Sequence, residues 1–328
     1  MKKILVTGGA GFIGAHLVNK ILSEKKYKVL IVDNLNTKGG IPFVNPSAKF
    51  YKGDILDTRI LKRIKKWKPE IIFHLAAQAG GEGSYDNPKN DYLINGYGTL
   101  RLAQLAKEIK CKKFVYTSTV AVYGNSKNTI SENSKINPDS FYGISKFAGE
   151  IFLKQILKDS KTQTCIFRLF NTFGPGENLK NTKKGMVGIY SYYIWQNMPI
   201  VIKGSLNRFR NFVYIDDCIN VLFKSISNKH LNNFETINLT SGKKVTVKKL
   251  IKTMLKVNKK KNYRLIVKND TPGDSFGLHS SKIYLKKKYK DLRFMKLEKS
   301  IEKYFKWINT LAKGSNLSKS HPLEKKIR

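Results

Sequence analysis

Tyr142 and Lys146 are the residues whose types and spacing point most directly to chemistry. They lie four positions apart in a predicted helix, so both side chains should point to one face. An ammonium group beside a phenol favours the phenolate and lowers the pKa of tyrosine, which would give an acid or base usable near neutral pH. This spacing is common in packed helices, but Thr119 adds context. It ends the strand predicted over 113–119, where its hydroxyl could bind the same substrate oxygen.

A glycine-rich turn near the N-terminus predicts a site for the phosphates of a dinucleotide. The sequence Thr7-Gly8-Gly9-Ala10-Gly11-Phe12-Ile13-Gly14 follows an apolar run over 4–6 and leads into helical apolar spacing over 12–22. Gly9 and Gly11 would let the backbone approach a pyrophosphate, and Gly14 would let helix and strand pack closely. The helix N-terminus would present N–H groups and a positive partial charge to the phosphates.

Asp33 indicates which dinucleotide is bound. It ends the next predicted strand, over 28–32, where a carboxylate accepts hydrogen bonds from the adenosine ribose and would repel a 2′-phosphate. This favours NAD over NADP. The alternative is that Asp33 is only a turn residue before Asn34.

The remaining pattern places these residues in a doubly wound α/β fold. Strands are predicted over 48–55, 70–77, 113–119 and 164–170, and helices over 58–67, 91–110 and 141–158. This alternation is typical of a parallel sheet with its ligand site at the carboxyl ends of the strands. We expect a Rossmann domain over 1–172, with a return segment at about 211–240 that includes a strand over 212–215. A smaller α/β substrate domain would comprise 173–210 and 241–312, and 313–328 would be a disordered tail.

Composition gives weaker indications about partners. The formal net charge of +39 suggests nucleic-acid binding, but the basic residues are mostly lysines spread through every segment. We therefore expect no nucleic-acid partner and treat the charge as background that can attract anionic substrates.

No signal peptide or membrane-spanning run is apparent. The three cysteines suit reduced thiols in a cytoplasmic protein, and neither they nor the five histidines have metal-ligand spacing.

Taken together, these motifs resemble the extended short-chain dehydrogenase/reductase family, in particular its nucleotide-sugar epimerases and dehydratases. The resemblance covers 1 to about 310. It is carried by the glycine turn, Asp54-Ile55, His74-Leu75-Ala76-Ala77, Asn95, the stretch from Thr117 to Gly124, Tyr142-x-x-x-Lys146, Arg168-x-x-Asn171 and Arg210-x-Phe212 through Asp217.

The resemblance implies a role for each candidate residue. Tyr142 would be the general base at a sugar hydroxyl, usually at C4, so that hydride transfer to NAD gives a transient 4-keto sugar. Lys146 would also bind the nicotinamide ribose, and Thr119 would orient the hydroxyl. The implied cofactor-binding residues are Gly8, Gly11, Phe12, Ile13, Gly14, Asp33, Asn34, Asp54, Ile55, Leu75, Ala76, Ala77, Tyr142 and Lys146. The implied substrate-binding residues are Ser118, Thr119, Asn171, Arg210, Asp274 and Leu278.

The residues after Thr119 favour one reaction of this family. In the related 4,6-dehydratases an Asp-Glu pair follows the catalytic threonine, whereas this chain has Val120 and Ala121. The glutamate typical of related UDP-glucuronate decarboxylases is also absent. A 4-epimerase needs no such acid, and we expect epimerisation. The alternatives are a dehydratase, a decarboxylase, a 4-keto-sugar reductase and, among non-enzymes, an NAD-sensing or nucleic-acid-binding protein.

The substrate and the assembly are less sharply defined. We expect a UDP-hexose, a UDP-N-acetylhexosamine or a UDP-hexuronate. Leu278 stands where a bulky aromatic in UDP-hexose 4-epimerases can exclude N-acetylated sugars, so we hypothesise room for a modified sugar. A loop over 80–84 could also shape selectivity. Relatives commonly dimerise through the helices holding Asn95 and Tyr142, and we expect a homodimer.

Overall fold

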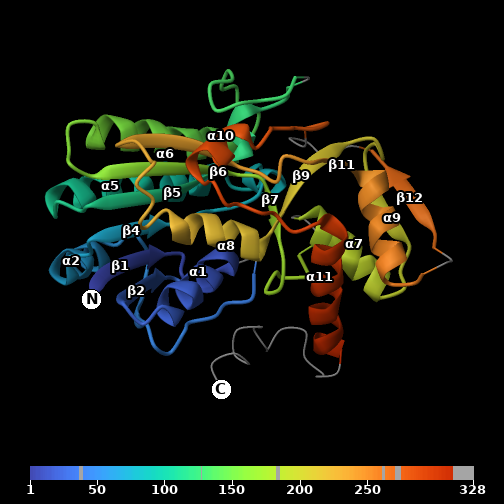
Figure 1. Ribbon diagram of the computed structural model, residues 1–328, viewed down its shortest axis with the longest axis horizontal. Helices are drawn as coiled ribbons and strands as arrows, with labels where there is room; N and C mark the ends of the chain where they lie inside the picture. Colours follow the sequence, from blue (N-terminus) through green and yellow to red (C-terminus); the bar gives the residue numbers. More distant parts are fainter. Residues whose placement is uncertain (37–39, 127, 182–184, 261–262, 270–274, 313–328) are drawn as a thin grey trace.

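The computed structural model contains a large parallel sheet with helices on both faces and a smaller α/β part beside it (Figure 1). The structure describes residues 1–36, 40–126, 128–181, 185–260, 263–269 and 275–312. The predicted tail over 313–328 therefore lies outside the described residues.

The large sheet has the strand order of a dinucleotide-binding fold. Within the described residues it comprises seven strands in the order β10-β6-β5-β4-β1-β2-β3, and each neighbouring pair is parallel. Apart from the extra edge strand β10, this is the Rossmann order, so the doubly wound fold predicted from the sequence is confirmed. The strands are β1 (Lys2–Thr7), β2 (Tyr27–Asp33), β3 (Lys49–Lys52), β4 (Ile71–His74), β5 (Lys113–Thr119), β6 (Gln163–Leu169) and β10 (Phe234–Leu239).

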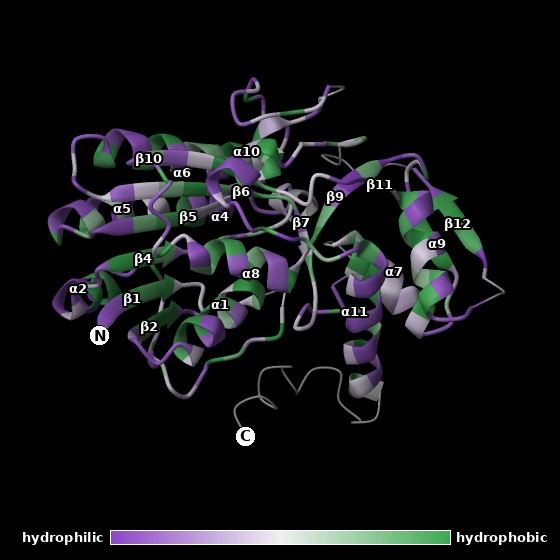
Figure 2. Cartoon of the chain, in the orientation of Figure 1, coloured by the Kyte–Doolittle hydropathy of each residue, from purple (hydrophilic) through white to green (hydrophobic). Residues whose placement is uncertain are grey.

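Two apolar layers cover the two faces of this sheet. One layer includes α1 (Phe12–Ser23) and α8 (Ile215–Lys224), which pack against each other. The other includes α2 (Thr58–Trp67), α5 (Gly98–Glu108) and α6 (Phe141–Leu157). Every residue of β4 and β5 is buried, as expected of central parallel strands covered on both faces. Figure 2 shows the central strands coloured as hydrophobic between helices of mixed character.

Side-chain caps fix where several helices begin. The Asp57 carboxylate accepts a hydrogen bond from the Arg59 N–H at the start of α2. The Ser140 hydroxyl accepts one from the Gly143 N–H at the start of α6, and Thr246 caps α9 (Val247–Val257) in the same way. These bonds satisfy backbone donors that a helix N-terminus otherwise leaves unpaired.

The smaller part combines two short sheets with three longer helices. A three-stranded sheet has the order β11-β9-β7, and a two-stranded sheet pairs β12 with β8. The elements are β7 (Asn171–Phe173), β8 (Ile200–Lys203), β9 (Phe209–Tyr214), β11 (Lys244–Thr246), β12 (Leu265–Lys268), α7 (Met186–Trp195), α9 and α11 (Leu297–Ala312). The short helix α10 (Ile283–Lys288) returns to contact β10 of the large sheet.

Two expectations about the elements need correction. The strand predicted over 212–215 does not return to the first domain: β9 pairs with β7 and β11, and only α8 and β10 rejoin the large sheet. The apolar residues over 212–215 indicate that this strand is buried, but they do not indicate which sheet it joins. The helix predicted over 91–110 is divided into α4 (Pro88–Asp91), a π-helical segment (Tyr92–Tyr97) and α5.

No helix in the described ranges has both the length and the apolar character needed to cross a membrane.

Candidate active site

A cavity of about 440 Å³ lies at the carboxyl ends of the central strands and extends to the smaller part of the molecule. Such a place is where ligands bind in open parallel sheets. Eleven of the predicted site residues line it, from elements far apart in the sequence: Phe12, Ile13, Leu75, Ala77, Ser118, Thr119, Tyr142, Lys146, Asn171, Arg210 and Leu278. Asp274, also predicted as a substrate contact, lies outside the described residues.

The glycine turn after β1 is shaped by close backbone packing. Gly8 has φ +70°, and a Cβ there would lie 2.6 Å from the Ala76 nitrogen. A Cβ on Gly14 would overlap the Gly8 carbonyl oxygen. At Gly11, by contrast, a Cβ would come no closer than 3.4 Å to another group, again the Gly8 oxygen. Gly8 and Gly14 therefore build the turn, whereas the side of Gly11 that a Cβ would occupy is open.

The start of α1 fits a bound phosphate. Its N-cap is Gly11, which provides no side-chain cap, and the first turn has no acidic residue. Backbone N–H groups and the positive end of the helix are therefore presented next to the open side of Gly11. These residues fit the pyrophosphate of a dinucleotide.

Carboxylates shape the loops where the adenosine was predicted to bind. Asp33 accepts hydrogen bonds from the backbone N–H of Ala10 (3.0 Å) and of Leu35 (2.8 Å), so it also holds the glycine turn in place. The Asn34 side chain donates to Asp54 (3.0 Å). Ile55 is buried in the apolar layer under α2 and α5, where its side chain contributes to the core.

Thr119 and Tyr142 come together where β5 ends and α6 begins. Thr119 Oγ1 accepts a hydrogen bond from the Ala121 N–H (3.2 Å), which starts the 3₁₀ turn Val120–Tyr123. The cap made by Ser140 places Tyr142 in the first turn of α6, and the Tyr142 hydroxyl is hydrogen-bonded to the Thr119 side chain. The two hydroxyls are therefore neighbours, and the prediction that both bind one substrate oxygen stays a prediction.

The prediction that Lys146 lowers the pKa of Tyr142 is wrong for the free protein. Burial raises the pKa of Tyr142 to about 12, and the hydrogen bond with Thr119 offsets only part of that rise. Lys146 is 1% exposed, and burial lowers its pKa to about 7. Its ammonium lies 4.1 Å from the centroid of the Tyr116 ring. Desolvation is the largest influence on both pKa values, and the charges that act on them are those of Asp91 on Tyr142 and of Glu150 on Lys146.

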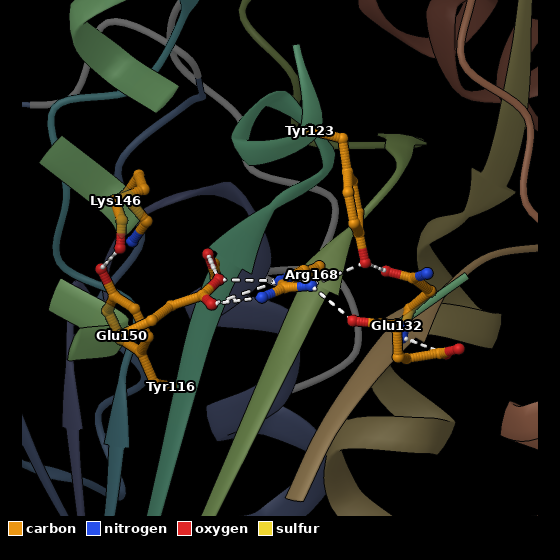
Figure 3. A network of polar contacts seen from close by, with 8 residues as sticks. Tyr116, Tyr123, Glu132, Lys146, Glu150 and Arg168 are labelled. Atoms are coloured by element: carbon orange, nitrogen blue, oxygen red, sulfur yellow. Dashed lines mark hydrogen bonds and ion pairs between the residues drawn. The ribbon is translucent and has the colours of Figure 1, made fainter. Parts of the chain in front are cut away.

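Ser118 lines the cavity, but its hydroxyl is already engaged. It donates to the carboxylate of Glu150, which also binds Arg168 (Figure 3). The prediction that Ser118 contacts substrate stays a prediction, because a hydroxyl that donates to Glu150 can still accept a hydrogen bond. The sequence offered no sign of this bond, since Glu150 lies on α6 and 32 positions away.

Asn95 fixes the loop that follows β4. Its amide donates to the Gln78 carbonyl (2.9 Å) and the Ser145 hydroxyl (3.0 Å), and its Oδ1 accepts from the Gln78 N–H (3.0 Å). Asn95 lies in the π-helical segment, and such segments often occur at functional sites. The neighbouring Asp91 is fully buried, and burial raises its pKa to about 6.

Cations line the wall of the cavity formed by the smaller part. Arg210 was predicted, and its guanidinium donates to the carbonyls of Ser275 (2.7 Å) and Phe276 (3.2 Å). Arg208 and Lys203 line the same cavity and were missed. Strand alternation could have indicated Arg208, because it lies two positions before Arg210 and so faces the same side. Within the described residues no cluster of three His, Cys, Asp or Glu side chains is placed to hold a metal ion.

Comparison with known proteins gives matches to nucleotide-sugar epimerases and also to dTDP-D-glucose 4,6-dehydratases. A family model described as the NAD dependent epimerase/dehydratase family matches residues 4–240. The chain is 35% identical over 249 residues to a putative UDP-glucose 4-epimerase of Methanocaldococcus jannaschii, covering 75% of this chain and 79% of the relative. The solved UDP-glucose 4-epimerase of Thermotoga maritima with UDP-glucose has a TM-score of 0.87 at 29% identity, covering 94% of this chain and 99% of the other. The UDP-glucuronic acid 4-epimerase of Bacillus cereus, in complex with UDP-glucuronic acid and NAD, has a TM-score of 0.85 at 26% identity, with 94% and 99% covered.

Proposed function

Since this chain belongs to the NAD dependent epimerase/dehydratase family, we propose that it is a nucleotide-sugar 4-epimerase that acts through a transient 4-keto sugar. NAD is the cofactor of this family. The observation that carries the proposal is the meeting of Thr119, Tyr142 and Lys146 in one cavity with the first residues of α1 and a cationic wall. We also propose that the glycine turn and Asp33 hold NAD, and that Asn171, Arg208 and Arg210 face the substrate diphosphate.

Tyr142 is the proposed base. A proton leaves the sugar 4-hydroxyl for the Tyr142 oxygen while the Thr119 hydroxyl holds that oxygen in place, and the proton returns when the carbonyl is reduced. The chemistry that NAD supplies when bound is hydride transfer, and its oxidised ring carries a positive charge. Because the pKa of Tyr142 is about 12 in the free protein, proton transfer needs positive charge close to the phenol. We propose that protonated Lys146, which does not lower the pKa of Tyr142 in the free protein, supplies this charge once NAD and substrate are bound.

The acidic groups of the cavity support epimerisation over dehydration. Among the described residues that line it, the carboxylates are Asp139 and Glu177. Asp139 accepts from the Asn125 amide (2.8 Å), and Glu177 accepts from the Gly174 N–H (3.1 Å). Val120 and Ala121, which follow Thr119 directly, carry no acid. The finding supports a reaction without water elimination, and a dehydratase, decarboxylase or 4-keto-sugar reductase is the alternative.

The substrate that we propose is a UDP-hexose, a UDP-N-acetylhexosamine or a UDP-hexuronate. Leu278 lines the cavity and its side chain is buried, so the wall at this point is apolar and compact. The solved relatives bind UDP-glucose and UDP-glucuronic acid, which supports the UDP part of the proposal.

The test of this function is turnover of a panel of UDP-, GDP- and dTDP-sugars followed by NMR without added reductant. We expect one UDP-sugar to be converted to its C4 epimer, with the equilibrium reached from either side. A product that has lost water or carbon dioxide, or a need for stoichiometric reduced cofactor, would contradict the proposal.

Two adjacent helices support the proposal that the chain forms a homodimer. Ile144 and Ile151 lie seven positions apart on α6, so they share one face, and both are 50% exposed. Tyr92 and Tyr97 are exposed on the adjoining π-helical segment. Ile144→Lys is expected to lower the dimer fraction in sedimentation, whereas Ile283→Lys, at a site on α10 that is 76% exposed, is the matched control. A monomeric wild-type protein would contradict this.

A further inference from the structure

A buried ion pair lies beside the turn of α6 that carries Lys146 (Figure 3). Arg168 on β6 binds the carboxylate of Glu150 on α6 through Nε (3.0 Å) and Nη2 (2.7 Å), and both residues are 5% exposed. Neither residue lines the cavity. A buried pair of this kind is weak support for stability, because desolvating two charges offsets much of their attraction. Its position therefore calls for another explanation.

Glu150 touches the catalytic strand and lies near Lys146. It accepts the hydrogen bond of Ser118, the residue before Thr119. It also lies four positions after Lys146, one turn along the same face of α6. Figure 3 shows Glu150 between Arg168 on one side and the Lys146 turn of α6 on the other. One carboxylate thus contacts the strand that holds Thr119 and lies beside the charge of Lys146.

Arg168 extends the network towards the substrate wall. Its Nη1 donates to the hydroxyl of Tyr123 (2.7 Å), which donates to the side chain of Asn238 (2.8 Å). The Asn238 amide in turn donates to the hydroxyl of Ser280 (3.3 Å). Ser280 lies two positions after Leu278, which lines the cavity. The network therefore runs from the end of β5 to the segment that carries Leu278 at the cavity.

We propose that Glu150 is a positioning residue, which through Ser118 and Arg168 sets Thr119 against Tyr142 and supplies the negative charge facing Lys146. This rests on the proposed function, because it assumes that Thr119, Tyr142 and Lys146 act on substrate. The chemical requirement is strict: the two hydroxyls come from different elements, β5 and α6, and must meet at one substrate oxygen. Glu150 bonds across those two elements.

The electrostatic part follows from the groups that surround Lys146. Burial lowers its pKa to about 7, and the Glu150 charge opposes that fall. The other groups facing it are His74 from β4, whose own pKa Lys146 helps to lower, the ring of Tyr116 from β5, and Tyr142 on the same helix. None of these supplies a negative charge near neutral pH. Without the Glu150 charge, Lys146 would lose its proton at a lower pH.

The test compares Glu150→Gln with two other variants. Ser118→Ala removes only the bond to β5 and leaves the ion pair in place. Glu235→Gln is the matched control, because Glu235 forms another buried pair, with Lys288 (2.6 Å), away from the cavity. Glu150→Gln should lower kcat about 10- to 100-fold with a smaller change in KM, as expected when reacting groups are misplaced. Its alkaline limb of kcat should move to lower pH, whereas Ser118→Ala should lower kcat without moving that limb.

A second measurement does not depend on turnover. The pKa of Lys146 can be followed by ¹⁵N NMR of the lysine side chains, with Lys146→Arg used to assign the signal. We expect Glu150→Gln to lower this pKa and Glu235→Gln to leave it unchanged. An unchanged Lys146 pKa, or an unchanged kcat in both Glu150→Gln and Ser118→Ala, overturns the inference. A wild type that binds NAD but converts no sugar, with the Lys146 pKa still lowered in Glu150→Gln, would instead overturn the proposed function and the positioning role with it.

Discussion

Two glycines of the same turn are predicted to respond differently when each is changed to alanine. Gly14→Ala should lose stability, whereas Gly11→Ala should lose affinity for NAD. Gly14 lies inside α1, where alanine is better than glycine by about 1 kcal/mol in intrinsic propensity. A Cβ there would nevertheless overlap the Gly8 oxygen and lie 2.8 Å from the Gly9 Cα, so backbone would have to move. Overpacking typically costs about 1–3 kcal/mol. Because the overlap is with backbone atoms, we take the upper end of this range and expect Gly14→Ala to lose about 2 kcal/mol in the free energy of unfolding despite the gain in propensity.

Gly11 is predicted to behave in the opposite way. Its backbone, at φ −76° and ψ 179°, suits alanine, and the nearest atom to a Cβ would be 3.4 Å away. Gly11→Ala should therefore fold normally, with a change in unfolding free energy of about 0.5 kcal/mol or less. The methyl group would occupy the open side of the turn, where we propose that the pyrophosphate lies. A loss of about 1.4 kcal/mol in binding corresponds to a tenfold rise in the Kd for NAD, and we expect at least that.

Thermal unfolding and calorimetric titration with NAD separate the two effects. Gly14→Ala should lower the Tm by several degrees, since about 1 kcal/mol corresponds to roughly 2–4 °C for a large domain. Gly11→Ala should keep the Tm and lose affinity. Unchanged NAD affinity in Gly11→Ala would refute the placement of the pyrophosphate, and an unchanged Tm in Gly14→Ala would refute the packing argument.

Three further predictions concern single side chains. Tyr142→Phe keeps the ring and removes the proton-transfer group, so kcat should fall at least about 10²–10⁴-fold while calorimetry shows NAD still bound; near wild-type turnover would exclude Tyr142 as the base. Burial raises the pKa of Asp91 to about 6 from 3.8, so its ionisation destabilises the fold increasingly as pH rises between those values. Asp91→Asn should therefore be more stable to urea than wild type by roughly 2–3 kcal/mol at about pH 8 but not at about pH 3.5, and equal gains at both would contradict this. Asp57→Ala removes the cap of α2 and should cost about 1 kcal/mol of stability without lowering kcat, so lost turnover at unchanged stability would be inconsistent with a capping role.

Local patterns predicted the parts of the site that depend on neighbouring residues. The spacing of the glycines identified the turn after β1, and the four-residue spacing of Tyr142 and Lys146 placed both on α6 at the cavity. The apolar runs of β4 and β5 indicated buried parallel strands, because such strands are apolar on both faces.

Some features of the fold and the site were not predicted from the sequence, because they depend on contacts between distant segments. The partner sheet of β9 depends on β7 and β11, and the bond from Ser118 to Glu150 joins β5 to α6. The rise in the pKa of Tyr142 comes from desolvation, which depends on everything packed around the ring. The sequence shows that Lys146 lies four positions after Tyr142, but it does not show how deeply the Tyr142 ring is buried.

The central event of the proposed reaction is that hydride leaves C4 of the sugar and returns to the same carbon within one cavity. The direct test is NMR of the product formed from UDP-[4-²H]glucose, UDP-[4-²H]N-acetylglucosamine or UDP-[4-²H]glucuronic acid in ordinary water. We predict that the accepted substrate gives its C4 epimer with the deuterium retained at C4. Loss of the label to solvent or to released cofactor, or a product changed at another carbon, would contradict the account.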